Sequence, residues 1–159
     1  MPLKKQKSPD GDFVFKPEDS IGYLIRDTHR AFSRLLGAAI ADADVTVGMW
    51  FFLRALWEED GLTQRELSRR IGMTEPTTVS AIDTMEKRGF VTRRIDSADR
   101  RRRLVCLTEK GLALKHELLP RAWDVNMVAV AALTPEEVVT LRDLMSRIKA
   151  NLEEETAQG

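Results

Sequence analysis

The chain has 159 residues, enough for one domain with a buried core, and its 43% hydrophobic and 31% charged residues are typical of a globular protein. No apolar stretch approaches the ~18 residues needed to cross a bilayer, which excludes a membrane-spanning class. The net charge is zero, but residues 61–110 hold 12 Lys+Arg against 7 Asp+Glu while the rest holds 13 against 18, and this basic middle is predicted to attract a polyanion.

The chain begins with a Lys-rich segment and continues into two helices. Residues 1–17 carry Gly, Pro and mixed charges, and we expect a mobile N-terminal arm there. Apolar residues then recur every three or four positions from Ile21 to Ala39, which predicts one face of a long helix. A second helix is predicted from Val47 to Asp60, and its sequence, apolar nearly all round, is typical of a helix buried among neighbours.

A helix-turn-helix is predicted next. Thr63 and Glu66 form a capping box at the start of a short helix, and Gly72 can end that helix in the left-handed conformation. Thr74 can cap a second helix, with Pro76 in the first turn, where the missing N–H of proline costs nothing. Two helices joined by such a short connection form a helix-turn-helix motif.

The second of these helices is predicted to bury Val79, Ile82 and Met85 and to expose a polar side. Short hydroxyl side chains on that side can reach the base edges or phosphates of DNA. An ordinary amphipathic helix with a solvated polar side is the alternative interpretation. The DNA-binding residues predicted on this helix are Thr74, Pro76, Thr77, Thr78, Ser80 and Thr84.

A β-hairpin and two long helices are predicted to complete the chain. Residues 90–95 and 103–107 are rich in strand-forming residues and flank a short polar turn at residues 96–99. Further helices are predicted after Thr108 and after Thr134, both of which can act as caps. We therefore expect a mainly α fold with a small β-hairpin wing, that is, a winged helix-turn-helix with long flanking helices.

Four consecutive arginines, Arg100 to Arg103, run from the predicted tip of the hairpin into its second strand. Arg100 and Arg101 are the candidates for a narrow minor groove, whose negative potential attracts arginine, and Arg102 is a further candidate. A solvated, salt-bridged hairpin is the alternative, but exposed ion pairs contribute only ~0–1 kcal/mol, so stability is a weak reason for such a cluster. We interpret the cluster as a DNA-binding surface.

Two more arginines, Arg93 and Arg94, lie on the first predicted strand of the hairpin. Successive strand residues point to opposite faces, so these two side chains cannot both meet one ligand. They are predicted either to contact phosphates or to pair with Asp96 and Asp99.

A resemblance to the MarR (multiple antibiotic resistance regulator) family of transcriptional regulators is carried by the segment GLTQRELSRRIGMTEPTTVSAIDTMEKRGFVTRRIDSADRRRRLVCLTEKG. The wing pattern of that family is close to D-x-R-D-R-R followed by V-x-L-T-x-x-G, and Ala98 stands where the family often has arginine. The flanking helices also follow the order of the family, so the resemblance covers about residues 18–155. The matching positions are Asp96, Asp99, Arg100, Arg101, Val105, Leu107, Thr108 and Gly111.

The resemblance implies a homodimer that binds a palindromic operator in double-stranded DNA, usually as a repressor. The residues support a dimer independently, because the apolar stripes of the helices at 21–39 and 138–152 are too extensive for a small lobe to bury alone. A monomer that packs the stripes internally is the alternative. The expected divisions are a mobile arm at 1–17, an N-terminal dimerisation helix and linker at 18–46, a DNA-binding lobe at 47–108 and C-terminal dimerisation helices at 109–159.

Effector sites in the family lie between the dimerisation helices and the DNA-binding lobe, and two groups of residues are candidates for such a site. A basic stripe on the first helix, with a histidine at its edge, can receive a carboxylate or phosphate. Two tryptophans and an arginine on the second helix can wall an aromatic ligand. A solvated charged stripe and core tryptophans are the alternatives. The candidates are Arg26, His29, Arg30, Arg34, Trp50, Arg54 and Trp57.

The segment MWFFLRALWEEDGLTQRELS is similar to family members that regulate aromatic-acid catabolism, some of which respond to hydroxycinnamoyl-coenzyme A thioesters. The resemblance therefore implies a small aromatic acid or its CoA thioester as the effector. Two other functions stay open, an architectural DNA-binding dimer without an effector and a redox-responsive regulator that uses Cys106. A small buried hydrophobe is the alternative interpretation of that cysteine.

Catalysis, cofactors and bound metals are not expected. His29 and His116 lie on different predicted helices, and the sequence holds no H-x-x-x-H, C-x-x-C or Gly-rich phosphate loop. A single cysteine excludes an internal disulfide and suits a reducing compartment, and the polar start MPLKKQKSPDGDF does not resemble a secretory signal. We expect a cytoplasmic, nucleoid-associated regulator of transcription that is not an enzyme.

Overall fold

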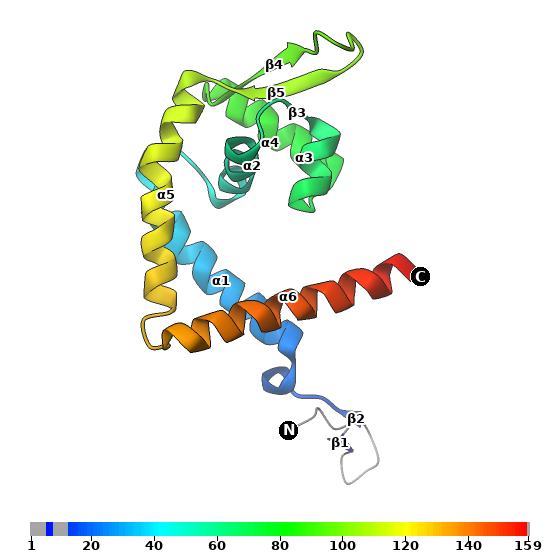
Figure 1. The fold of residues 1–159 in the computed structure, drawn as a ribbon, viewed down its shortest axis with the longest axis vertical. Coiled ribbons are helices and arrows are strands. Elements are labelled where there is room, and N and C mark those ends of the chain that lie inside the picture. Colours follow the sequence, from blue (N-terminus) through cyan, green and yellow to red (C-terminus); the bar gives the residue numbers. More distant parts are fainter. Residues whose placement is uncertain (1–5, 8–12, 159) are drawn as a thin grey trace. The chain divides into compact units, whose positions relative to one another are not determined.

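The computed structural model describes residues 6–7 and 13–158 (Figure 1). The mobile arm expected at residues 1–17 falls largely on residues 1–5 and 8–12, which lie outside the described part. In chain order the elements are β1 (Gln6–Lys7), β2 (Phe13–Val14), the 3₁₀ helix η1 (Pro17–Asp19), α1 (Ile21–Ile40), the 3₁₀ helix η2 (Ala41–Ala43), α2 (Val47–Glu58), β3 (Leu62–Thr63), α3 (Gln64–Ile71), α4 (Glu75–Lys87), β4 (Val91–Ile95), β5 (Arg103–Leu107), α5 (Glu109–Ala129) and α6 (Pro135–Gln158).

The chain forms two compact units, one ending at Ala122 and one beginning at Trp123. The core of the first unit is centred on α2, whose Phe52, Leu53 and Leu56 are completely or almost completely buried. This confirms the prediction of a helix enclosed by its neighbours. The helix ends at Glu58, two residues before the predicted end, and Gly61 lies in the turn that follows with φ +75°.

The first helix of the helix-turn-helix begins and ends at the predicted residues, and the second begins at the predicted cap Thr74. Thr63 and Glu66 form the capping box at the start of α3, and Gly72 ends α3 with φ +72°. The Oγ of Ser68 donates a hydrogen bond to the carbonyl of Met73 at 2.5 Å, which fixes the connection between α3 and α4. These local interactions set the direction in which α4 leaves the turn.

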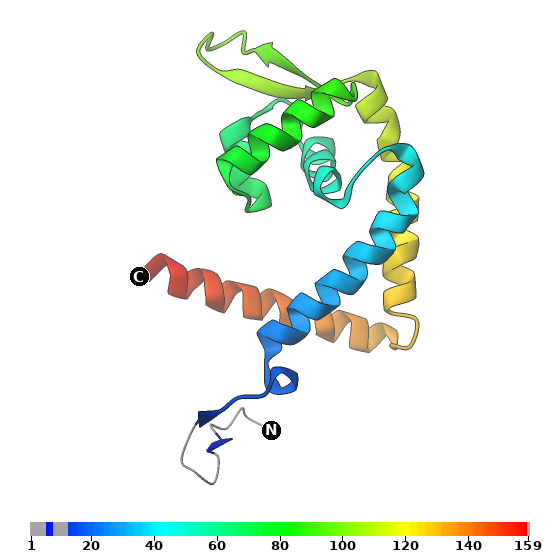
Figure 2. The ribbon, with the colours of Figure 1, turned by 180° about the vertical axis from the view of Figure 1, so that it is seen from behind.

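The predicted hairpin is part of a three-stranded antiparallel sheet with the order β3-β5-β4. The prediction of a two-stranded hairpin is therefore incomplete, because Leu62 of the two-residue strand β3 pairs with Val105 of β5. In both views the β4–β5 hairpin, hereafter the wing, projects beyond helices α2 to α4, with its tip on the side of α3 (Figures 1 and 2).

The base of the wing is held against the start of α5. Thr108 caps α5 by accepting from the N–H of Gly111 at 3.0 Å, and its hydroxyl donates to the carbonyl of Gly89 at 2.6 Å. A Cβ atom at Gly111 would lie 2.0 Å from the carbonyl oxygen of Phe90, so only glycine fits there. The indole N–H of Trp57 donates to the Gly111 carbonyl at 2.9 Å and ties this junction to α2.

The second unit contains the end of α5 and the whole of α6. Thr134 and Glu137 cap α6 reciprocally, as the sequence predicts. Many large apolar side chains of this unit are exposed, among them Trp123 and Leu141. Within residues 6–7 and 13–158, no single helix has both the length and the apolar character of a membrane span; α1 with η2 passes that test only together with α2, across a bend of 78°.

Candidate nucleic-acid interface

The first turn of α4 presents hydroxyl groups to solvent. The Thr74 hydroxyl accepts from the N–H of Thr77 at 3.4 Å and lies 2.9 Å from the Thr77 hydroxyl, so the cap also orients that side chain. Pro76 occupies the first turn, where it leaves no hydrogen bond unmade. Thr74, Pro76, Thr77 and Ser80 are all exposed, in agreement with the prediction that these residues face outward.

The predicted phase of α4 is wrong at two residues. Thr78, expected to face DNA, is fully buried, whereas Val79, expected to face the core, is 40% exposed. The buried face consists of Thr78, Ile82 and Met85, spaced four and three residues apart. Burial of Thr78 is possible because its hydroxyl donates to the Thr74 carbonyl at 3.1 Å, which leaves its methyl group to pack in the core.

A groove of about 530 Å³ runs along one side of α4. Thr84 lines this groove. Its hydroxyl donates to the Ser80 carbonyl at 2.9 Å, so it has no proton left to donate to a ligand. Thr84 can still accept a hydrogen bond from a ligand or base. The groove is lined by Thr46, Gly48, Met49, Phe52, Met73, Pro76, Thr77, Ser80, Ala81 and Thr84.

Arg93 joins the wing to α4. Its guanidinium forms ion pairs with Asp83 at 2.5 Å and with Glu86, and its backbone N–H donates to Glu86 at 3.1 Å. The side chain is only 23% exposed. The expectation that Arg93 pairs with Asp96 or Asp99 is therefore wrong, because acidic side chains on α4 hold it, while its contact with a phosphate stays a prediction.

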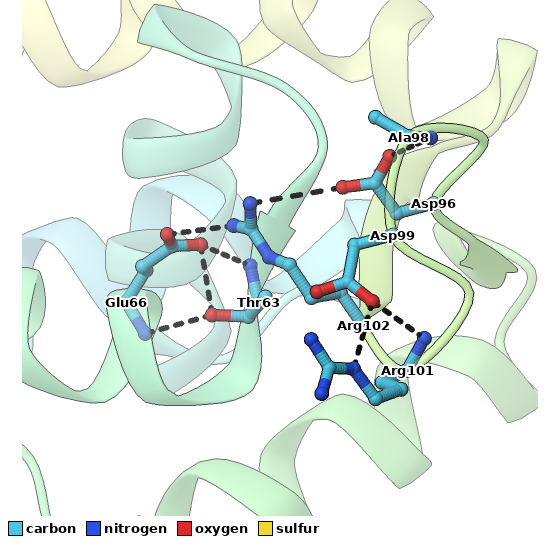
Figure 3. A network of polar contacts seen from close by, with 7 residues as sticks. All are labelled: Thr63, Glu66, Asp96, Ala98, Asp99, Arg101 and Arg102. Atoms are coloured by element: carbon cyan, nitrogen blue, oxygen red, sulfur yellow. Dashed lines mark hydrogen bonds and ion pairs between the residues drawn. The ribbon is translucent and has the colours of Figure 1, made fainter.

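The tip of the wing is shaped by hydrogen bonds from backbone N–H groups to aspartates. Asp96 accepts from the N–H of Ala98 at 2.8 Å, and Asp99 accepts from the N–H of Arg101 at 3.0 Å (Figure 3). The Arg101 N–H and then its side chain, which bonds Asp99 at 3.2 Å, lower the pKa of the Asp99 carboxyl. The Arg101 side chain remains 92% exposed, so the tip presents its guanidinium to solvent.

Arg102 turns back from the tip toward α3. One guanidinium nitrogen lies 2.9 Å from Oε1 of Glu66, and another lies 3.7 Å from Oδ2 of Asp96 (Figure 3). The other Glu66 oxygen accepts from the backbone N–H of Thr63 at 2.7 Å, which is the largest cause of the lowered pKa of Glu66. Arg102, a predicted minor-groove candidate, thus braces the wing against α3.

Three arginines of the wing form no ion pair with a carboxylate among the described residues. Among the described residues Arg94, Arg100 and Arg103 have no ion-pair partner within 4.0 Å, and all three are exposed. Together with Arg101, whose guanidinium is 92% exposed although it pairs with Asp99, they place positive charge on a projecting hairpin. The exposed hydroxyls of α4 and these arginines form a surface suited to duplex DNA, which offers phosphates to the arginines and hydrogen-bonding base edges to the hydroxyls.

The residues predicted for an effector site have different surroundings. Trp50 and Trp57 are buried and stack edge to face at 5.6 Å between ring centroids, so they belong to the core. The guanidinium of Arg54 lies over the Trp50 ring at 5.8 Å and pairs with Glu58 at 3.6 Å. The four candidates on α1 are exposed: Arg26, His29, Arg30 and Arg34.

The thiol of Cys106 lies on β5 and is half-buried. Burial, and then the charge of Asp60, raise the pKa of the Cys106 thiol above its ordinary value. A raised pKa lowers the thiolate fraction and therefore the reactivity toward oxidants. The surroundings favour the packing interpretation of this residue over the redox one.

Sequence reasoning missed the acidic residues that anchor the arginines. Glu66 was assigned only to the capping box, although one carboxylate can serve the cap with one oxygen and Arg102 with the other. No sequence pattern indicates that Glu86 pairs with Arg93, because the two residues are brought together only by the packing of β4 on α4. Side chains alternate between the two faces of a strand, so Arg93 lies on the same face as the buried Val91, and this is the one pattern that indicates which arginine faces the helix.

The fold and this surface define a winged helix-turn-helix protein that binds DNA. A family model described as the MarR family matches residues 45–102. A solved probable transcriptional regulator from Pseudomonas aeruginosa is 32% identical, covers 84% of this chain and 99% of its own, and superposes with a TM-score of 0.76.

Two further relatives agree with that class. The HTH-type transcriptional regulator YybA of Bacillus subtilis (strain 168) is 27% identical over 78% of this chain and 83% of its own length. PcaV from Streptomyces coelicolor, solved in complex with its natural ligand, is 28% identical, with coverage of 86% and 96% and a TM-score of 0.76. The chain belongs to the MarR family and is a transcriptional regulator.

Proposed function

We propose that the protein is a homodimeric repressor that occupies a palindromic operator and leaves it when a small effector binds. The observation that supports a dimer is the set of large apolar side chains that remain exposed to solvent in each unit. Burying one such leucine or isoleucine contributes ~1.5–3 kcal/mol, so the set is sufficient for a permanent association. The exposed residues are Ile21, Leu24 and Leu35 on α1 and Trp123, Met127, Val128, Leu141, Leu144, Met145 and Leu152 in the second unit.

The symmetry of the dimer determines the symmetry of the operator. Two copies related by a twofold axis present two α4 helices, which requires a palindrome with half-sites about one helical turn apart. In each half-site Thr77 and Ser80 contact the major groove, and Arg100 and Arg101 contact the adjacent minor groove. Arg94 contacts a phosphate.

The effector is a small aromatic acid or its CoA thioester, and its anionic group binds to α1. Arg26, Arg30 and Arg34 follow one another at intervals of four residues, and all are exposed. Only Arg30 has a carboxylate partner in the described residues, Asp27 at 3.9 Å, a weak contact that an anion can displace. Because the two tryptophans are buried, they do not form the aromatic wall unless the core opens.

Ligand responsiveness is supported by PcaV, a relative named with its natural ligand. The effector must bind better to a dimer whose α4 helices no longer match one turn of DNA. It then lowers DNA affinity by the ratio of its affinities for the two states.

The test is a fluorescence-anisotropy titration on the DNA upstream of the protein's own gene and on a scrambled duplex, combined with light scattering. We expect a dimer that prefers the upstream duplex, and release by an aromatic acid or thioester. An Arg30→Ala variant should keep DNA binding and lose the response, while Arg147→Ala on α6 should keep both. Equal affinity for both duplexes would instead support an architectural DNA-binding dimer.

A further inference from the structure

We propose that Val79 contacts the C5-methyl group of a thymine in each half-site and thereby fixes one base pair of the operator. The inference rests on the proposed binding of α4 in the major groove and names a residue that sets its sequence preference. Val79 is the fifth residue of α4, in the half of a recognition helix that approaches the bases. Its side chain is 40% exposed.

Neither packing nor helix stability explains a valine at this position. The core-facing side of α4 is made by Thr78, Ile82 and Met85, and Val79 lies outside it. At an exposed helix position valine is less favourable than alanine, because its branched Cβ restricts the side chain against the preceding turn. Single exposed apolar residues are common on protein surfaces, so the argument depends on where this one lies.

The residues beside Val79 on the surface of α4 indicate which kind of DNA group it can contact. Pro76 precedes it by three residues and Asp83 follows it by four, so the three side chains share one side of the helix. Pro76 is exposed, which extends the apolar surface toward the start of the helix. Asp83 is held by Arg93 at 2.5 Å, so this carboxylate is bound and neutralised.

DNA offers one apolar group on a base edge in the major groove, the methyl group of thymine. The exposed hydroxyls of Thr77 and Ser80 suit the polar atoms of base edges and cannot use that methyl. An apolar side chain among them, close to a bound carboxylate, therefore suits a base pair that contains thymine. Removing water from one methyl group is worth on the order of a fourfold change in affinity.

The test begins with selection of the tightest duplex from a random library by the full-length wild-type protein. Each thymine of the selected duplex is then replaced by uracil, in one half-site at a time, which removes only the methyl group. We expect one position per half-site at which uracil weakens binding by about fourfold. Because the change is made in the DNA, misfolding of a protein variant cannot produce this result.

The same duplexes are then titrated with Val79→Ala and with Val139→Ala, which removes the same two methyl groups from an exposed valine on α6. Val79→Ala should bind the thymine duplex more weakly and be indifferent to uracil, whereas Val139→Ala should keep the fourfold effect. If every thymine tolerates uracil, or if Val79→Ala is as sensitive as the wild type, the assignment of Val79 is overturned. If selection yields no preferred duplex, operator recognition itself fails and the role of Val79 fails with it.

Discussion

Arg102 and Glu66 join the wing to the start of α3, with 2.9 Å between a guanidinium nitrogen and a carboxylate oxygen. The two residues are 36 positions apart in sequence, and the bond places the arginine-rich tip relative to the helix-turn-helix. The same carboxylate caps α3, so one side chain both stabilises the start of that helix and holds the wing in place. Arg102 therefore positions the wing, in contrast to Arg100 and Arg101, which are proposed to contact DNA.

Replacing Arg102 by alanine is expected to weaken operator binding without changing its dependence on salt. The pair is partly exposed, so it contributes at most ~1 kcal/mol, which corresponds to about a fivefold loss of affinity. Anisotropy titrations at several salt concentrations measure both quantities. Glu66→Gln should give a similar loss, because it removes the same pair. A lower salt slope in Arg102→Ala would show that this arginine contacts a phosphate.

Replacing Arg101 by alanine should lower both the affinity and its salt dependence. Each phosphate neutralised by the protein contributes a slope of about −0.9 in log K against log salt, so its loss flattens the slope by that amount per contact. The guanidinium is almost fully exposed, so the fold should not change. Arg147→Ala, an exposed arginine on α6, serves as the control. An unchanged slope in Arg101→Ala would remove this residue from the DNA contacts.

Thr77→Val and Thr78→Val should differ in their effect on DNA binding. The Thr78 hydroxyl is buried and shares the Thr74 carbonyl with the backbone N–H of its own residue, so its removal leaves no acceptor without a partner. Thr78→Val should therefore keep operator binding and change the free energy of unfolding by less than ~1 kcal/mol. Thr77→Val removes an exposed hydroxyl and should weaken binding. Equal losses in both variants would mean that α4 is rotated from the phase described.

Acidification should remove the stabilising contribution of Glu66. Its pKa is lowered from an ordinary 4.5 by the hydrogen bonds of Thr63, and then by Arg102, so the folded protein favours the charged form. This contribution is fully present above pH ~4.5 and is lost as the pH falls through the lower folded-state pKa. The melting temperature of the wild type should exceed that of Glu66→Gln near neutral pH, and the gap should narrow below pH 4.5. A gap that is constant with pH would contradict this linkage.

Leu141→Asp should break the dimer and operator binding together. A carboxylate in the middle of an apolar interface loses its hydration without gaining a partner. Light scattering measures the mass, and anisotropy on the operator duplex measures the binding. Ser146→Asp introduces the same charge away from the apolar stripe of α6 and should leave both unchanged. A Leu141→Asp protein that stays dimeric would place the interface elsewhere.

Some expectations failed because short-range patterns do not report long-range pairing. The two residues of β3 are too few to show a period, and their strand conformation depends on β5, some 40 residues later. Hydrophobicity alone assigned Val79 to the core and Thr78 to the surface. The structure reverses this because a threonine hydroxyl can be satisfied by the helix backbone, so its polarity does not prevent burial.

The sequence by itself determined the order of the helices, the capping box at Thr63, the cap at Thr134, the glycine turns, the hairpin and the basic character of the wing. These features depend on interactions within a few residues, which a linear pattern contains. Only the tertiary structure decided which side of α4 faces solvent and which arginines are held by Asp83, Glu86 and Glu66. Those outcomes depend on side chains brought together from distant segments, because the energy of an ion pair or a packed face depends on distance in space and not on separation along the chain.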